Sequence, residues 1–530
     1  MRDRVAVSGA IIALTFLSFL FPGHTFLRSD TQIYVPMLEH IWDPSALAND
    51  LVATKPHLAF TLYDEIAIAL RWITRTSFEA VLVGQQFVFR ALEILGVYLL
   101  ALSFPFSRTK AMLVAALFTL GATILGPAVL TIEYEPVPRA FAVALLFLAI
   151  GLVAQNHLMW ADIAAAVAFL YHPPTVWVFW ILYLWLTLRH RDYRDLWPII
   201  ASVALLFVSS RLQAGAADQQ VFFARIGPEL EQLQRMRASY NWVSTWPAAM
   251  VLQYVFLWIA STVAFWRVQP KAARLFLVGM PAIGILSIPL SYLLLEKLKW
   301  ALIPQLQPAR GVLYITAMAV ILGAAAGIRA AESRRWTESI VWFAIVLAVP
   351  AAPRLFSISV YNAAIVLALA VGFVAILWLA PGRVIVPAAL TMMALASFLA
   401  MAYLVHVQNY PRLDLTSIDD VVHFARDHTT KDAVFLFGDA GRSPNPSIFR
   451  AEALRAVYVD WKSGGQINFS PDVADEWRDR WQGTHQLRFD PSDMSRLAGL
   501  GITYLILSRD HALPGRQTVY ENSQYLVYRI

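Results

Sequence analysis

The sequence predicts a polytopic α-helical membrane protein with about 13 transmembrane helices and a small C-terminal α/β soluble domain. Its 530 residues are 58% hydrophobic and 15% charged, and the mean hydropathy is +0.56. A water-soluble chain is about 45–50% apolar and about 25% charged. The charged residues are 42 basic and 36 acidic side chains, and about 30 of this combined set lie from Tyr403 onward. This density of charge predicts that the last quarter of the chain is soluble. These observations exclude a single soluble enzyme.

Apolar segments of the length that a bilayer requires, about 20 residues, recur along the chain. They cover residues 5–22, 79–104, 111–130, 138–154, 158–171, 174–188, 197–210, 247–266, 275–295, 311–328, 338–352, 357–380 and 384–405. The predicted membrane domain is therefore residues 1–405, and residues 406–530 form the predicted soluble domain.

Basic residues in the short loops orient the chain, because cytoplasmic loops of membrane proteins are enriched in lysine and arginine. Placing the N-terminus inside also places the following basic clusters inside: Arg108/Lys110, Arg189/Arg191/Arg194, Arg267/Lys271/Arg274 and Arg329/Arg334/Arg335. The sequence thus predicts a cytoplasmic N-terminus and an extracytoplasmic C-terminal domain. The net charge of +6 is explained by these loops and gives no indication of nucleic-acid binding.

The long first outer loop, residues 23–78, is expected to carry two helices lying at the membrane surface. In the first, apolar residues recur at helical spacing until Trp42-Asp43-Pro44, where the proline disfavours further helix. The second is predicted over about 57–73. A short charged helix is expected from Pro228 to Arg237 in the loop 211–246.

Helix and strand signals alternate in the tail. Helices are expected over 417–426, 471–481 and 491–500, and strands over 433–437, 456–459, 502–507, 518–521 and 525–528. This pattern predicts a small α/β domain with one sheet. It contains no GxGxxG, P-loop or His-Glu-x-x-His motif, and the chain has no cysteine, so no cofactor is assigned and Cys-ligated metal is excluded.

Asp30 is the first candidate for catalysis. It follows the first span by about eight residues, on the predicted outer face, just before a surface helix. A carboxylate held at the membrane boundary could act as a general base toward an acceptor hydroxyl, or bind a metal that holds a lipid-linked phosphate. The alternative is a solvated helix cap, since aspartate is a favoured N-cap residue.

Four residues at outer ends of spans are candidates for binding a donor phosphate or sugar. Arg310 lies at the mouth of a span, where a guanidinium can bind phosphate in bidentate fashion or simply reach the interface. Arg139 and Glu133 belong to one short charged loop that is either a polar cavity wall or a self-neutralising loop. His172, in a turn between two spans, could contact a phosphate or sugar or merely be hydrogen-bonded.

Weaker candidates of the same type are Lys55 and His57 in the first outer loop. Arg90 and Glu93 fall within the second span at a spacing that would let them pair with each other. In the tail, Phe449-Arg450, Arg455 and Val459–Lys462 form a polar and aromatic cluster, for which ligand binding and loop tethering are equally open.

The arrangement resembles the GT-C superfamily of membrane glycosyltransferases. The resemblance rests on many spans, an acidic residue after the first of them, two juxtamembrane helices in the first outer loop and an external α/β domain. The segment Asp30 to Asp50, the run Asp427 to Leu436 and the cluster from Phe449 to Lys462 are similar to a poorly characterised bacterial group of GT-C-like proteins.

This resemblance implies transfer of a hexose or pentose from a polyprenyl-phosphate-linked donor to a glycan, lipid or protein acceptor on the outer face of a bacterial inner membrane. Asp30 matches the catalytic acid of the family by position, and Arg310 is a candidate ligand for the donor phosphate. No Asp-x-Asp or Asp-Glu pair follows the first span, so no metal ligand is assigned and a divalent metal stays open. The Trp-Trp-Asp-Tyr-Gly signature of oligosaccharyltransferases is missing, which disfavours protein N-glycosylation.

Two alternatives of other classes remain. One is a transporter or flippase of a lipid-linked glycan, which would favour inverted repeats and broken helices. The other is a non-catalytic GT-C-like scaffold in envelope assembly.

Overall fold

A computed structural model describes residues 2–55, 61–127, 129–190, 193–212, 224–352, 354–379, 385–405, 416–468, 471–485 and 488–530. Contacts divide the chain into two units. We call the first, made of Met1–His24, Val83–Phe207 and Tyr240–Pro411, the helical bundle. We call the second, made of Thr25–Leu82, Val208–Ser239 and Arg412–Ile530, the α/β unit. The loop after the first predicted span therefore groups, by its contacts, with the C-terminal domain.

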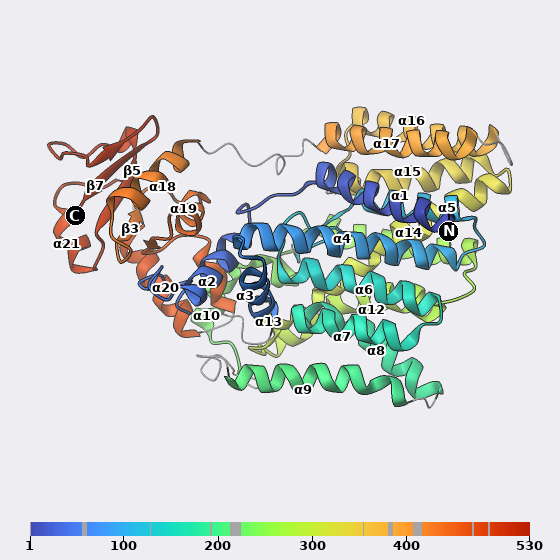
Figure 1. The fold of residues 1–530 in the computed structure, drawn as a ribbon, viewed down its shortest axis with the longest axis horizontal. Helices are drawn as coiled ribbons and strands as arrows, with labels where there is room; N and C mark the ends of the chain where they lie inside the picture. The colour runs from blue at the N-terminus through green and yellow to red at the C-terminus, as the bar shows by residue number, and fades with distance from the viewer. Residues whose placement is uncertain are drawn as a thin grey trace. The chain divides into compact units, whose positions relative to one another are not determined.

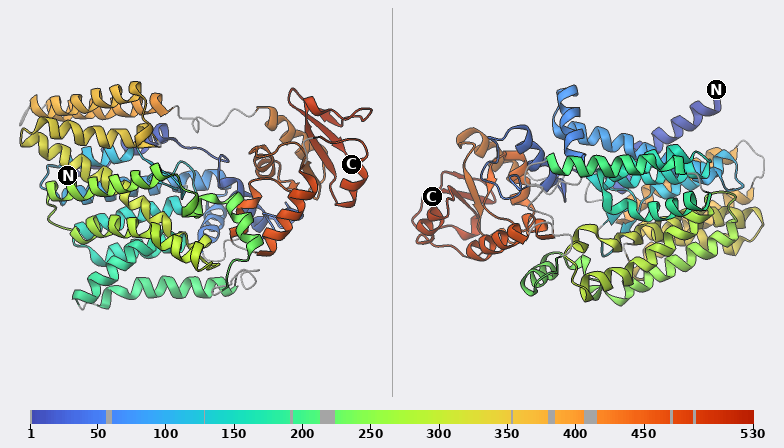
Figure 2. Two further views of the ribbon diagram at one scale, coloured as in Figure 1. Left: turned by 180° about the vertical axis from the view of Figure 1, so that it is seen from behind. Right: turned by 90° about the horizontal axis from the view of Figure 1, so that it is seen from below.

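Long helices running side by side make up the helical bundle (Figures 1 and 2). They are α1 (Arg2–Ser18), α4 (Phe78–Leu102), α5 (Arg108–Thr119), α6 (Pro138–Ala154), α7 (Leu158–Tyr171), α8 (Pro173–His190), α9 (Trp197–Leu212), α11 (Ala248–Val268), α12 (Arg274–Ser291), α14 (Val312–Glu332), α15 (Trp336–Ala351), α16 (Val360–Leu379) and α17 (Ile385–Val405). Shorter helical segments are η1 (Phe19–Gly23), η2 (Tyr193–Leu196), η4 (Ser239–Asn241), η5 (Val243–Thr245), η6 (Tyr292–Lys297), α13 (Ile303–Leu306), η7 (Pro308–Gly311) and η8 (Leu355–Ser357).

The composition of these helices confirms a multi-pass membrane protein. In the part of the chain that the structure describes, seven helices are long and apolar enough to cross a membrane, and four further apolar helices are shorter. Each predicted span overlaps one of the long helices of the bundle. The number of thirteen crossings itself stays a prediction.

Helix α14 forms the centre of the bundle. It packs against α5, α11, α12, α15 and α16, and nearly all its residues are buried. Its sequence explains this position, because it is rich in alanine and glycine, and small residues let neighbouring helices approach closely. The first turn of α14 carries part of the candidate site.

The predicted third span, 111–130, is wrong in its second half. Helix α5 ends at Thr119, and the chain continues as a short hairpin of β1 (Thr123–Ile124) and β2 (Val129–Leu130). Gly121 and Gly126 have φ angles of +71° and +78°, which residues with a Cβ rarely adopt. The apolar residues of this stretch therefore pack as a turn rather than continuing the helix.

The α/β unit combines three stretches of the chain around one mixed sheet. Its helices are α2 (Thr31–Trp42), α3 (Tyr63–Thr74), α10 (Pro228–Arg237), α18 (Thr416–His428), α19 (Asn445–Ala453), α20 (Pro471–Thr484) and α21 (Asp493–Gly499), with η9 (Ser463–Asn468) and η10 (Arg509–His511). The strands are β3 (Val434–Phe437), β4 (Ala456–Val457), β5 (Tyr504–Ser508), β6 (Tyr520–Glu521) and β7 (Tyr525–Arg529). They lie in the order β4-β3-β5-β7-β6, in which β3 is parallel to β4 and β5 and the other pairs are antiparallel.

Most predicted elements of this unit are confirmed to within a few residues. The second helix of the first loop begins at Tyr63, later than the predicted residue 57, and part of that prediction lies outside the described residues. Helix α19 was not predicted, because its nine residues begin with Asn445-Pro446 and lack an extended apolar period.

A fully buried ion-pair network joins the first loop to the tail within the α/β unit. Arg450, on α19, donates from Nε to Asp50 Oδ2 at 2.7 Å and from Nη1 to Asp460 Oδ2 at 3.2 Å. All three side chains are at most 1% exposed. Asp50 also accepts the amides of Val52 and Val457, at 2.9 and 3.0 Å. The cluster that includes Arg450 and Asp460 therefore tethers segments of the chain, which was one of its two interpretations.

We expect Arg450→Met to lower the free energy of unfolding of the α/β unit by about 3–5 kcal/mol, because it leaves two buried carboxylates without their counter-charge. Burial alone would raise the pKa of Asp460, but Arg450 and neighbouring hydroxyls lower it from 3.8 to about 2. The contribution of this carboxylate is therefore complete above about pH 4 and is lost as the pH falls toward 2. Urea unfolding of the detergent-solubilised protein at pH 7 and pH 3 measures both effects. Adding Asp50→Asn and Asp460→Asn to the variant should restore stability, and equal stability of Arg450→Met and wild type would contradict the prediction.

Candidate functional site

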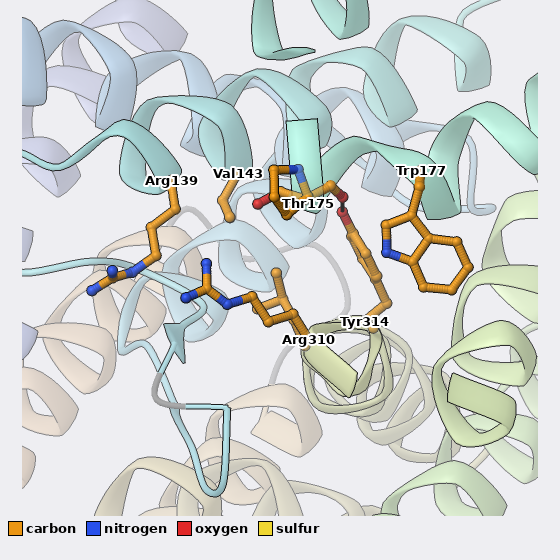
Figure 3. A pocket seen from close by; sticks show the side chains of 9 residues that line it. Arg139, Val143, Thr175, Trp177, Arg310 and Tyr314 are labelled. Carbon is orange, nitrogen blue, oxygen red and sulfur yellow. Dashed lines mark hydrogen bonds between the residues drawn. The ribbon is translucent and has the colours of Figure 1, made fainter. Parts of the chain in front are cut away.

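A pocket in the helical bundle is lined by η7 and by the N-terminal ends of α6, α8 and α14 (Figure 3). The lining residues are Arg139, Val143, Pro174, Thr175, Trp177, Arg310, Gly311, Leu313 and Tyr314. Helix N-termini carry a partial positive charge and favour anions. Proline begins α6 and α8, which fixes the start of each helix but removes an N–H donor. The groups of the pocket that can bind an anion are therefore mainly side chains and not the backbone amides of these two helices.

Arg139 and Arg310 supply two guanidinium groups to this pocket. Figure 3 shows both groups extending toward the same side of it. Guanidinium matches the oxygen atoms of a phosphate in bidentate fashion and stays charged at every physiological pH. The pocket thus has the charge and donor geometry that a phosphate group requires.

His172 holds Arg310 in place. Arg310 Nη1 donates to His172 Nε2 at 3.1 Å, and His172 Nδ1 lies 2.5 Å from Thr175 Oγ1. Because arginine can only donate, Nε2 must present its lone pair, so His172 is neutral in this arrangement and its Nδ1–H donates to Thr175. Tyr314 donates its hydroxyl to the carbonyl of Thr175 at 2.8 Å, which links α8 to α14 beside the arginine.

Glu133 holds Arg139. The Nε of Arg139 donates to Glu133 Oε1 at 2.6 Å, and the Glu133 side chain is 3% exposed. The backbone carbonyl of Glu133 accepts a hydrogen bond from the fully buried Arg90 at 2.5 Å. Glu133 is thus fixed from both its backbone and its side chain, and it orients Arg139 toward the pocket.

The predicted ion pair between Arg90 and Glu93 is wrong. Arg90 donates to the carbonyls of Ser18, Gly23 and Glu133, at 2.5–2.9 Å. These carbonyls belong to the end of the first helical segment and to the hairpin loop, where backbone acceptors have no helical partner. Glu93 and Glu133 lie near enough to provide the counter-charge, while the carbonyls accept the hydrogen bonds.

Asp30 belongs to the α/β unit and stands at the N-cap position of α2. Its side chain makes no capping hydrogen bond to the helix. Its carboxylate instead accepts a hydrogen bond from Lys462 Nζ at 2.7 Å. The side chain of Asp30 is 28% exposed, and that of Lys462 is 21% exposed. Ser29 Oγ also lies 3.4 Å from the same carboxylate oxygen. The interpretation of Asp30 as a simple helix cap is therefore wrong, whereas its catalytic role stays a prediction.

A family model described as a domain of unknown function, DUF6798, matches residues 416–483. No curated protein matches the chain. The crystal structure of ArnT from Cupriavidus metallidurans bound to undecaprenyl phosphate has a TM-score of 0.51 at 14% identity, over 99% of this chain and 98% of ArnT. The chain therefore shares its fold with this ArnT structure. ArnT from the same organism in the apo state also matches, with a TM-score of 0.46 and 12% identity over 99% and 98% of the two chains.

Lys55 and His57 are the remaining residues that the sequence predicts for the site. Lys55 forms an ion pair with Glu476 of α20. Burial alone would raise the pKa of Glu476, but the hydrogen bond from Lys55 and the charge of Arg480 lower it. His57 lies outside the described residues. Among those described, no group of three or more histidine, aspartate or glutamate side chains could hold a metal ion.

Sequence reasoning identified only Arg139 and Arg310 among the residues that line the pocket, and it missed one partner of Asp30. Thr175, Trp177 and Tyr314 carry no signal that distinguishes them from other residues at the ends of apolar helices. Lys462 was noted only as part of a tail cluster, because nothing in a sequence pairs residues 432 positions apart. Four of the predicted residues form two contacting pairs, Arg310 with His172 and Arg139 with Glu133.

Gly284 of α12 allows close packing against the segment that carries Arg310. A Cβ at Gly284 would lie 2.6 Å from the carbonyl oxygen of Gly311 and 2.9 Å from Ile315 Cγ1. We expect Gly284→Ala to lower the melting temperature by several degrees, because this overlap outweighs the gain of about 1 kcal/mol in helix propensity. Gly84→Ala is the matched control, since nothing lies within 4 Å of its Cβ position. Thermal unfolding that is unchanged or raised in both variants would contradict the expected overlap.

Proposed function

We propose that this protein is a membrane glycosyltransferase that moves a hexosyl or pentosyl group from a polyprenyl-phosphate-linked donor to an acceptor on the outer face of a bacterial inner membrane. The observation that carries the proposal is the pocket that contains both Arg139 and Arg310. In this proposal the helical bundle is the membrane part with its N-terminus in the cytoplasm. The C-terminal α/β domain is extracytoplasmic.

The pocket arginines bind the donor phosphate in this scheme. A lipid-linked phosphate lies at headgroup depth, where two fixed guanidinium groups neutralise it and hold it by charge-assisted hydrogen bonds. His172 and Glu133 orient these arginines before the ligand binds, which reduces the entropy lost on binding. ArnT, which shares the fold, was crystallised with undecaprenyl phosphate, and this supports a polyprenyl phosphate as the ligand class.

Asp30 is the general base in this scheme. Its carboxylate takes the proton of the acceptor hydroxyl as the oxygen forms a bond to the anomeric carbon of the sugar. The bond between that carbon and the phosphate oxygen breaks, and polyprenyl phosphate leaves with the electron pair. Binding of the phosphate by the arginines stabilises the negative charge that develops on the leaving group. The reaction is balanced without an oxidant or a further co-reactant.

We expect Asp30→Asn to reduce the rate of sugar transfer by about 10²–10⁴-fold, because an amide cannot accept the proton. The assay supplies purified protein with a panel of polyprenyl-phosphate-linked hexoses and pentoses and measures release of polyprenyl phosphate in the presence of envelope lipids and glycans. Asp43→Asn is the control, because Asp43 directly follows the other end of α2 and is exposed. Full activity of Asp30→Asn would refute the assigned base. Movement of the lipid-linked sugar across vesicles without transfer would instead favour a flippase.

We expect Arg310→Met to weaken binding of undecaprenyl phosphate about 10- to 100-fold, which corresponds to the loss of a charge-assisted hydrogen bond. Arg310→Lys should recover part of the affinity, because lysine keeps the charge but loses the bidentate geometry. Arg139→Met should behave like Arg310→Met. Arg267→Met provides a control in the same bundle, since Arg267 pairs with Glu338 and does not line the pocket. Equal affinities in all four variants, measured by tryptophan quenching in detergent, would rule out this pocket as the phosphate site.

A further inference from the structure

Lys462 is a residue of the tail that contacts the proposed general base. Its Nζ donates to Asp30 Oδ1 at 2.7 Å and lies 3.4 Å from Ser29 Oγ. It lies within residues 416–483, the segment matched by the family model of unknown function. The contact therefore gives that domain a place beside Asp30, within one structural unit.

The turn that carries Lys462 is fixed by hydrogen bonds on both sides. Asp460 lies two residues before Lys462, and its carboxylate accepts hydrogen bonds from Arg450 and from the amide of Ser463. Its backbone carbonyl accepts a hydrogen bond from Trp477 Nε1 at 2.9 Å. These contacts fix the turn, because moving it would separate the buried charges of Arg450 and Asp460.

Helix α10 fixes the same turn from the other side. Arg237 Nε donates to the carbonyl of Trp461 at 2.8 Å, and Arg237 Nη2 donates to the carbonyl of Lys462 at 3.3 Å. The guanidinium carbon of Arg237 lies 4.9 Å from the centre of the Trp461 ring, within the range of a cation–π contact. Contacts from α10, α19 and α20 thus fix the backbone position of Lys462.

We infer that Lys462 is a positioning residue for Asp30, and that the C-terminal domain serves catalysis by holding this carboxylate ionised and oriented. The inference rests on the proposed role of Asp30. An ammonium group within hydrogen-bond distance favours the charged form of a carboxylate, and a fixed donor selects one orientation of it. Arg28 precedes Asp30 by two residues, and Arg237 donates to the carbonyl of Trp461 in the turn that carries Lys462.

Lys431 offers a matched control on the same helix. Lys431, also from the tail, pairs with Asp43 at 3.0 Å, and these two side chains are 60% and 43% exposed. Asp30 and Asp43 flank the two ends of α2, so both pairs join the tail to the same helix. Only the Lys462 pair includes the proposed base. A merely structural role of such lysines would affect both variants in the same way.

The test measures the pH dependence of kcat/KM for sugar transfer in Lys462→Met, Lys462→Arg and Lys431→Met of the full chain. The acid limb of the Lys462→Met profile is expected at higher pH, because an aspartate without a cationic partner has a pKa of about 3.9. Transfer below about pH 4 should fall about tenfold for each unit by which the limb moves, while transfer at neutral pH approaches that of wild type. Lys462→Arg and Lys431→Met should keep the wild-type limb. A Lys462→Met profile that matches Lys431→Met, or that falls uniformly at every pH, would overturn the inference.

A second measurement does not depend on transfer. Acetylation of lysines by an amine-reactive ester, followed by mass spectrometry, should modify Lys462 faster in Asp30→Asn than in wild type, with Lys431 unchanged as an internal standard. Equal reactivity of Lys462 would show that the contact is absent and would overturn the inference. Absence of sugar transfer by the wild type would refute the proposed function, and full transfer by Asp30→Asn would refute Asp30 as the base. An active wild type and an inactive Asp30→Asn, together with a wild-type Lys462→Met profile, refute the inference alone.

Discussion

The buried contact of Arg450 with Asp50 and Asp460 is the constraint on which the α/β unit depends. Burying a charge without partners costs several kcal/mol, so the three groups are stable only together. Asp50 comes from the first loop, and Arg450 and Asp460 from the tail. The segments are about 400 residues apart in sequence, and the sheet alone would not join them, since its strands all come from the tail. The network therefore specifies which stretch of the first loop packs on the domain, and in what register.

Both candidate sites are supported by a fully buried arginine that acts through an intervening acidic residue. In the helical bundle, Arg90 holds the backbone of Glu133, and Glu133 orients Arg139. In the α/β unit, Arg450 holds Asp460, and the turn that begins there carries Lys462 to Asp30. An arginine with several saturated donors is rigid, because moving it would expose several polar groups at once. Rigid support of this kind is what preorganised binding groups require.

The sequence predicted the regular elements well because their signals are local. Long apolar runs predicted the bundle helices, and short apolar runs predicted strands of the tail. The errors have physical causes: Gly121 and Gly126 turn the chain inside an apolar run, and α19 is too short to show a period. Arg310, Arg139, Glu133 and His172 could be chosen from their positions at span ends. Their pairing could not, because Arg310 and His172 are 138 residues apart and meet only through helix packing.

Asp30 shows how a conflict between local and tertiary preferences can mark a functional residue. An aspartate at an N-cap ordinarily gains about 1 kcal/mol by accepting a helix amide. Asp30 forgoes that bond and turns to Lys462, although an ion pair of such partial exposure stabilises a protein by only about 0–1 kcal/mol. The exchange brings little or no stability, so stability does not explain it. Departures of this kind from local consistency are expected at functional sites. The side chain is partly exposed and makes no hydrogen bond to the helix amides, and this is the physical reason for proposing chemistry at Asp30.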